Sequence, residues 1–158
     1  MYKEAIKEYS VFLNKNDAWL ENKIDACIEV SRCFCSLQDY KNQIKSLFQS
    51  FEYDIPRAVV CCEIANSFIQ KGQYHMAIFW YITATNLKPN INGGGFENLE
   101  CYDYMPYLGL CLCYDKIGDY KNAKKYNELV GKIRPDDEKY LYCLLYTSPS
   151  PRDMRRSR

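Results

Sequence analysis

The chain has 158 residues, of which 21 are lysine or arginine and 20 are aspartate or glutamate, so its formal net charge is +1. This length suggests one domain, and the near-neutral charge gives no global attraction to nucleic acid or to an anionic membrane. Hydrophobic residues make up 47% of the chain, which is enough to build a packed core. We find no apolar run long enough to cross a bilayer and therefore expect no membrane span.

The first predicted element is a helix within residues 1–14, where apolar residues recur at helical spacing. This charged start has no apolar core of a signal peptide, so we expect a cytoplasmic protein. The nine cysteines fit that expectation, because their number is odd and no Cys-X-X-Cys pair occurs among them. A disulfide framework and a zinc site are both disfavoured by that pattern.

A repeat of 34 residues organises the rest of the chain. Tyr40 and Tyr74 are 34 residues apart, and Tyr120 follows Tyr74 after 46 residues, which is the same period plus 12. Within each unit the apolar residues predict two helices, and each unit ends near a proline. At the turn, Gly72 and Gly118 suit a positive φ, whereas Gln38 takes that place at some cost.

The predicted domains follow from this period. They are the second helix of a truncated repeat at 1–14, repeat one at 18–55, repeat two at 56–89, a glycine-rich insertion at 90–103, repeat three at 104–136, the start of a further helix at 137–142, and a tail at 143–158. We expect Met1 to be an internal methionine or an arbitrary start, and the alternative is that 2–13 form a capping helix. The Ser-Pro-Ser-Pro tail resembles translated sequencing-adapter read-through, and the alternative is a basic tail that binds RNA or a membrane.

The period and the order of its leucine, aromatic, glycine, alanine and proline positions resemble the tetratricopeptide repeat. The resemblance covers roughly residues 2–142. It implies an all-α fold, a right-handed α-α superhelix, with about three helix pairs plus half repeats in the solenoid.

In this repeat family the first helices line a concave groove that holds extended or helical peptides. The resemblance places nine partner-groove candidates there: Ile28, Arg32, Val59, Cys62, Asn66, Ile69, Met105, Leu108 and Leu112. The alternative is that these residues pack against neighbouring helices. Family members that grip a peptide carboxylate use lysine, asparagine and arginine, but only Asn66 and Arg32 remain here, so we expect no chaperone-tail binding. The mostly apolar groove suits a partner helix, a neighbouring domain or a second copy of the chain.

The insertion contains Gly93, Gly94 and Gly95, followed by an acidic aromatic stretch from Phe96 to Tyr104. No Gly-Lys-Ser/Thr follows the glycines, so they are not a phosphate loop. The stretch either reaches a partner or, as we favour, is a surface loop whose aromatic side chains cover the adjacent helices.

A narrower resemblance is to the C-terminal repeat region of bacterial family 2 glycosyltransferases. It is carried by the segments 77–81, 86–89, 94–96, 110–114, 118–120 and 133–135. It implies a non-catalytic docking or scaffold fragment that packs on its own transferase domain, holds a protein acceptor or self-associates. A nucleotide sugar and a divalent metal would bind only in that missing domain. The alternative is a free-standing tetratricopeptide adaptor that binds a peptide or protein.

The chain itself offers no catalytic, cofactor-binding or metal-binding residues. It contains no Asp-X-Asp, no nucleophile elbow and no dinucleotide fingerprint. We expect His75 to be solvated, and Trp19 and Trp80 to belong to the core rather than to a ligand platform.

Overall fold

The computed structural model describes residues 1–89, 98–138 and 140. It contains seven α-helices and two short 3₁₀ helices, and no strand occurs in these ranges. The elements are α1 (Tyr2–Leu13), α2 (Leu20–Ser36), α3 (Tyr40–Gln49), η1 (Ser50–Glu52), α4 (Ala58–Gln70), α5 (Tyr74–Asn86), η2 (Leu99–Tyr102), α6 (Tyr104–Lys116) and α7 (Tyr120–Ile133). The predicted all-α solenoid is confirmed.

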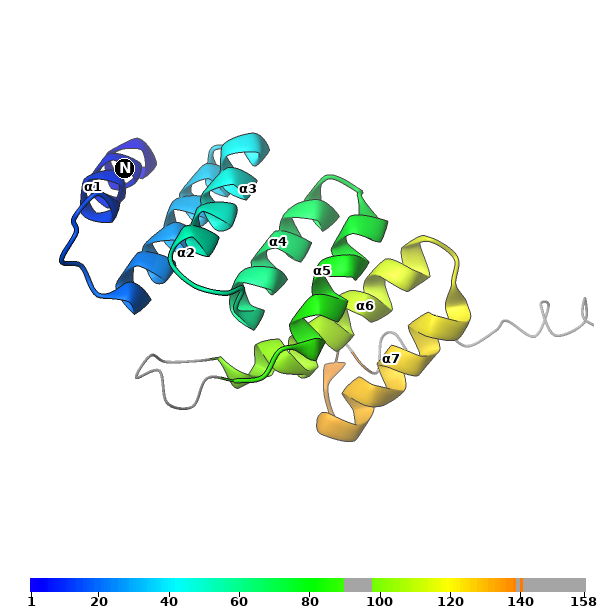
Figure 1. Cartoon of the computed structure of the whole chain (residues 1–158). Helices are drawn as coiled ribbons and strands as arrows, with labels where there is room; N and C mark the ends of the chain where they lie inside the picture. The colour runs from blue at the N-terminus through cyan, green and yellow to red at the C-terminus, as the bar shows by residue number, and fades with distance from the viewer. Residues whose placement is uncertain (90–97, 139, 141–158) are drawn as a thin grey trace, which may run out of the picture.

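Figure 1 shows the helices in one row from α1 to α7, each beside the helix that precedes it. The helices α2 and α3, α4 and α5, and α6 and α7 form the three pairs, and α5 packs against α6 to join the second pair to the third. The middle of the predicted insertion, with its three glycines and Phe96, and the tail at 143–158 lie outside the described residues.

The turns inside the pairs depend on three residues with positive φ: Gln38 at 58°, Gly72 at 68° and Gly118 at 80°. A left-handed residue ends a helix readily when it is glycine, because no Cβ meets the following carbonyl. Asp39 and Asp119 then begin the second helices, since each carboxylate accepts the backbone N–H of the asparagine three residues later at 3.1 Å. The same turn therefore repeats in the first and third pairs.

Small residues allow the helices within and between pairs to approach closely. Ser31, Ala65 and Cys111 occupy equivalent places in the three first helices and are all buried. Ala77 and Ala123 are fully buried at the equivalent place of two second helices. Burial raises the pKa of the Cys61 and Cys113 thiols to about 12, so these cysteines act as small core residues rather than as nucleophiles.

The two tryptophans differ. Trp80 packs against Phe48 and Phe51, with ring centroids 5.5 and 6.2 Å away, as a core residue should. The prediction that Trp19 belongs to the core is wrong, because its side chain is 55% exposed. Trp19 is the residue just before α2 and has an extended backbone conformation. The helical spacing that places apolar side chains on the inner face of α2 therefore does not apply to it. His75 is exposed, as expected.

Gly109 on α6 is required by the tyrosine that faces it. A Cβ added at Gly109 would lie 2.2 Å from Cζ of Tyr81, whose ring is buried between α5 and α6. In an ordinary helix, replacing glycine by alanine stabilises by about 1 kcal/mol. We predict the opposite sign for Gly109→Ala, a loss of about 1–3 kcal/mol in the free energy of unfolding, because the ring must move out of a packed site.

Urea denaturation followed by circular dichroism measures this change. Lys124→Ala, at an exposed position of α7, is the control and should change the midpoint little. A Gly109→Ala protein as stable as the parent would show that Tyr81 is not fixed against α6.

Gln43 on α3 is the weak point of the first pair. It stands where Ala77 and Ala123 stand in the other pairs, and it is only 4% exposed. Its Oε1 is buried without a hydrogen-bond partner among the described residues. An unsatisfied buried acceptor costs about 1–3 kcal/mol. We therefore predict that Gln43→Met, which keeps the length of the side chain, raises the free energy of unfolding by about 1 kcal/mol, measured by the same denaturation.

Gln43→Glu tests whether burial of the polar end of this side chain is the cause, because glutamate keeps the shape of glutamine and adds a buried charge. It should lower stability. Equal stability of the methionine and glutamate variants would contradict the burial of this side chain.

Candidate groove on the first helices

The nine partner-groove candidates lie at equivalent places on α2, α4 and α6, and the structure divides them by exposure. The open ones are Arg32, Asn66, Met105 and Leu112, the half-buried ones are Val59, Ile69 and Leu108, and the buried ones are Ile28 and Cys62. Ile28 packs with Leu47 and Ile64 in the core between the first two pairs, so the alternative of helix packing holds for it.

The end of the insertion covers part of the first-helix surface. The Cys62 thiol on α4 donates a hydrogen bond to the backbone oxygen of Cys101 on η2, at 3.5 Å. Both cysteines are 4% exposed, and Val59 and Tyr102 pack against the same apolar cluster. The favoured prediction, that the aromatic stretch covers adjacent helices, thus holds for Tyr102. Cys62 is therefore removed from the surface that a partner can touch.

The two polar candidates already have partners within the chain. Arg32 donates to Glu29 on its own helix and to Glu63 on α4, both at 2.7 Å. Asn66 accepts a hydrogen bond of 2.6 Å from the hydroxyl of Tyr81, which reaches it from α5. Two carboxylates offset the charge of the Arg32 guanidinium, which weakens its attraction for a further carboxylate such as that of a peptide.

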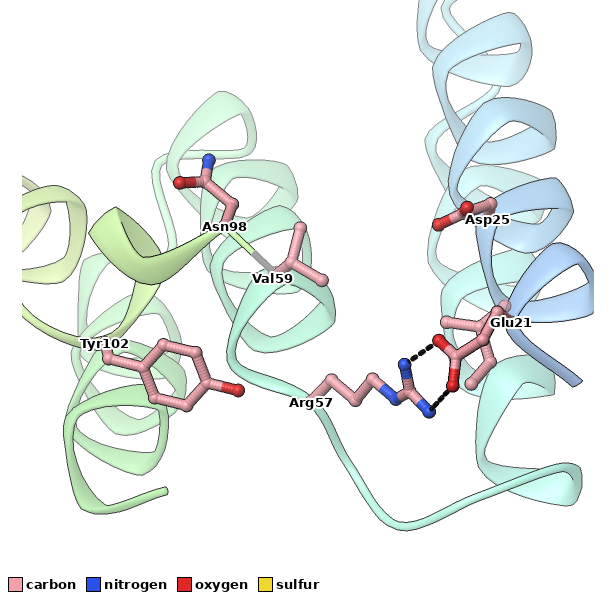
Figure 2. A pocket seen from close by; sticks show the side chains of 7 residues that line it. Glu21, Asp25, Arg57, Val59, Asn98 and Tyr102 are labelled. Atoms are coloured by element: carbon pink, nitrogen blue, oxygen red, sulfur yellow. Dashed lines mark hydrogen bonds and ion pairs between the residues drawn. The ribbon is translucent and has the colours of Figure 1, made fainter. Parts of the chain in front are cut away.

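A second arginine joins the first two pairs at the start of α4. The Arg57 guanidinium is bidentate to the Glu21 carboxylate on α2, with one N···O distance of 2.8 Å, and it also donates to Asp54 at 2.9 Å. The Arg57 side chain is 12% exposed and that of Glu21 is 11% exposed. Figure 2 shows this pair spanning the space between α2 and α4. Because the charges are largely desolvated, the pair is costly to break.

Beside this pair lies a cleft of about 30 Å³, which has room for about two water-sized groups. Its walls are Glu21, Ile24, Asp25, Arg57, Val59, Asn98 and Tyr102. In Figure 2 the Asp25 carboxylate points from α2 into this space, and Val59, Asn98 and Tyr102 stand on the opposite wall. Partial burial, and then the Glu21 carboxylate, raise the pKa of Asp25 above its ordinary value.

Of this cleft the repeat pattern indicated Asp25 and Val59, which occupy equivalent places on α2 and α4, although only Val59 was among the nine candidates. Glu21, Arg57, Asn98 and Tyr102 come from separate segments, and Asn98 and Tyr102 belong to the insertion. The one available signal was the distance of 36 residues between Glu21 and Arg57, close to the repeat period, which brings the starts of α2 and α4 together.

In the described ranges, no group of three or more histidine, cysteine, aspartate or glutamate side chains is arranged to hold a metal ion. No helix in the same ranges has the length and apolar character needed to cross a bilayer.

Comparison with known proteins agrees with this architecture. Residues 58–91, which contain α4 and α5, match the tetratricopeptide repeat family. Among solved structures, the chain is similar to the second tetratricopeptide domain of human RPAP3, determined by NMR in complex with the HSP70 peptide SGPTIEEVD. That likeness has a TM-score of 0.66 at 12% identity, over 84% of this chain and 100% of the other. No curated protein matches the chain. The chain therefore has the fold of a tetratricopeptide-like α-α solenoid, and its second pair matches the repeat itself.

Replacing Arg57 tests how much the ion pair with Glu21 contributes to stability. Arg57→Gln should lower the free energy of unfolding by about 2 kcal/mol, because Glu21 is left largely buried without its partner. The hydrogen bond from Arg57 lowers the pKa of Asp54 below its ordinary value of 3.8. Because this pKa is lowered in the folded state, the ionised Asp54 carboxylate stabilises the fold at neutral pH. This stabilisation is lost as the pH falls below about 4. The difference between parent and variant should therefore narrow in acid.

Thermal unfolding of the parent and the variant at pH 7 measures the loss of stability, and the same comparison at pH 3 measures how far that difference narrows. Arg134→Gln is the control, since its pair with Glu100 is 45% exposed on both sides and should matter much less. An Arg57→Gln protein that matches the parent at pH 7 would contradict the role given to this pair.

Proposed function

We propose that this chain is a protein-interaction module that holds a segment of a partner protein on the surface of its first helices. The observation that carries the proposal is an exposed apolar strip on α6. Met105 and Leu112 are 37% and 41% exposed and stand two helical turns apart, with half-buried Leu108 between them. Exposed apolar side chains at this spacing suit a helix or an extended segment laid across them.

The comparisons support the same reading without naming a partner. The tetratricopeptide match in repeat two and the likeness to a domain solved with a bound peptide both favour protein or peptide recognition. The open candidates Met105 and Leu112 provide two apolar contacts for such a segment, and Asn66, whose Oδ1 accepts from Tyr81, can add its amide N–H groups as donors. A second copy of the chain or a neighbouring domain could supply the same kind of segment, because either can present apolar side chains to Met105 and Leu112.

A narrower proposal is that the module is a docking region of a cytoplasmic bacterial family 2 glycosyltransferase. Its support is the resemblance of the segments 77–81, 94–96 and 110–114 to the repeat regions of such enzymes. The nucleotide sugar and divalent metal would then bind in a separate domain. Sequencing the gene outward from both ends tests this: an in-frame domain that carries Asp-X-Asp supports it, and its absence from the full gene leaves the free-standing adaptor.

The module itself is tested by selecting peptides from a phage-displayed random library on the immobilised full chain. The binding of the strongest peptide is then measured by fluorescence anisotropy. We expect Leu112→Glu to raise its Kd at least about tenfold, because a charge in an apolar contact costs more than about 1.4 kcal/mol.

Phe79→Glu is the matched control, since Phe79 is 59% exposed on α5, a second helix, and receives the same new charge. It should leave the Kd nearly unchanged. Peptides that bind both variants equally well would place recognition elsewhere, and peptides lost only with Phe79→Glu would assign it to the second helices.

A further inference from the structure

The groove is not uniform in charge, and its α2–α4 half is acidic. Around the cleft and the adjoining turn of the two helices, five carboxylates face two guanidinium groups. The carboxylates are those of Glu21, Asp25, Glu29, Asp54 and Glu63, and the cations are Arg32 and Arg57. The α6 half, by contrast, presents the exposed Met105 and Leu112.

Each of the two guanidinium groups is already paired with two carboxylates. Arg57 is held by Glu21 and Asp54, and Arg32 by Glu29 and Glu63, so these six groups pair among themselves. Asp25 is left, and among the described residues it has no ion pair. Its carboxylate points into the cleft from the wall opposite Val59 (Figure 2).

We propose that this cleft takes a cationic side chain, preferably lysine, from the partner segment that lies along the groove. This inference rests on the proposed function and specifies the chemistry of its partner. The lysine ammonium would meet the Asp25 carboxylate, and the cleft would thereby fix the register of a segment whose apolar residues rest on α6.

The dimensions of the cleft favour lysine over arginine. The cleft is small, at about 30 Å³, and this suits the compact ammonium of lysine better than the larger planar guanidinium. The apolar walls provided by Ile24 and Val59 suit the methylene stem of lysine. The amide of Asn98 adds a polar group on the side of the insertion.

Charge complementarity also distinguishes this partner from the peptide of the solved relative. The sequence of that peptide, SGPTIEEVD, is acidic. A surface with three more carboxylates than guanidinium groups repels such a segment and attracts a basic one. The same fold would therefore hold partners of opposite charge through different groove side chains.

The test is a parallel selection of phage-displayed random peptides on the full parent chain and on Asp25→Asn. Asparagine keeps the shape of the exposed Asp25 side chain, so the fold should be retained. We expect the parent to enrich lysine-containing peptides and the variant not to do so. For the best parent peptide, Asp25→Asn should raise the Kd about threefold to tenfold, as should replacing the peptide lysine by glutamine.

A double-mutant cycle decides whether the two groups meet. If they do, the glutamine peptide should lose no further affinity on Asp25→Asn, and the difference between parent and variant should shrink from about 0.1 to about 1 M salt. Glu128→Gln removes an exposed carboxylate from α7 and is the control that should leave the Kd unchanged.

The contrary outcomes are distinct. Enriched peptides without lysine that still need Leu112 would overturn the inference and leave the proposed function standing. An arginine peptide that binds as tightly as its lysine counterpart would overturn the preference for lysine. If no enriched peptide depends on Leu112, or if light scattering shows a stable dimer of the parent that Leu112→Glu converts to a monomer, a basic peptide partner is ruled out.

Discussion

The close approach of neighbouring helices at small residues is the constraint on which the rest of this solenoid depends. Ser31, Ala65 and Cys111 are buried where first helices meet their neighbours, and Ala77 and Ala123 play the same part in second helices. Without a large side chain at these places, the helices stack at short range and bury a continuous core. Each pair then leaves one surface of its first helix for other uses.

That close packing also determines what the groove can offer. Tyr81 fits only because Gly109 has no side chain, and its hydroxyl then occupies the amide of Asn66 on the groove surface. The α5–α6 contact and the groove thus share a residue. In the same way, Cys101 of η2 covers Cys62, so the insertion takes a candidate contact out of reach of a partner and adds a wall of its own.

Electrostatics then divides the groove into two regions of different character. In the α2–α4 region two arginines are surrounded by carboxylates, and they join helices rather than await a ligand. In the α6 region apolar side chains are exposed. Arg57 is largely desolvated and Arg32 is about half exposed, but each is paired with two carboxylates that offset its charge, so neither attracts a further anion strongly. A surface built in this way distinguishes partners by charge as well as by apolar fit.

The sequence by itself determined the helices, their pairing and the class of fold. Period, turn residues and apolar spacing are local properties of the chain, and Gly72, Gly118 and Ala77 carried that information directly. It also gave the places of the groove candidates along the first helices, because equivalent positions follow from the period.

Only the tertiary structure decided which of those places remain open and which charges are free. Ile28, Cys62 and Leu108 occupy the same place in the repeat pattern, yet Ile28 and Cys62 are buried while Leu108 is half-exposed. The physical reason is that burial and ion pairing depend on segments that are distant in sequence. Cys101 of η2, which lies in the insertion, covers Cys62 of α4, and Arg57 pairs with Glu21, 36 residues before it. A period places a side chain on a helix face, but the neighbour that covers or neutralises it comes from elsewhere in the fold.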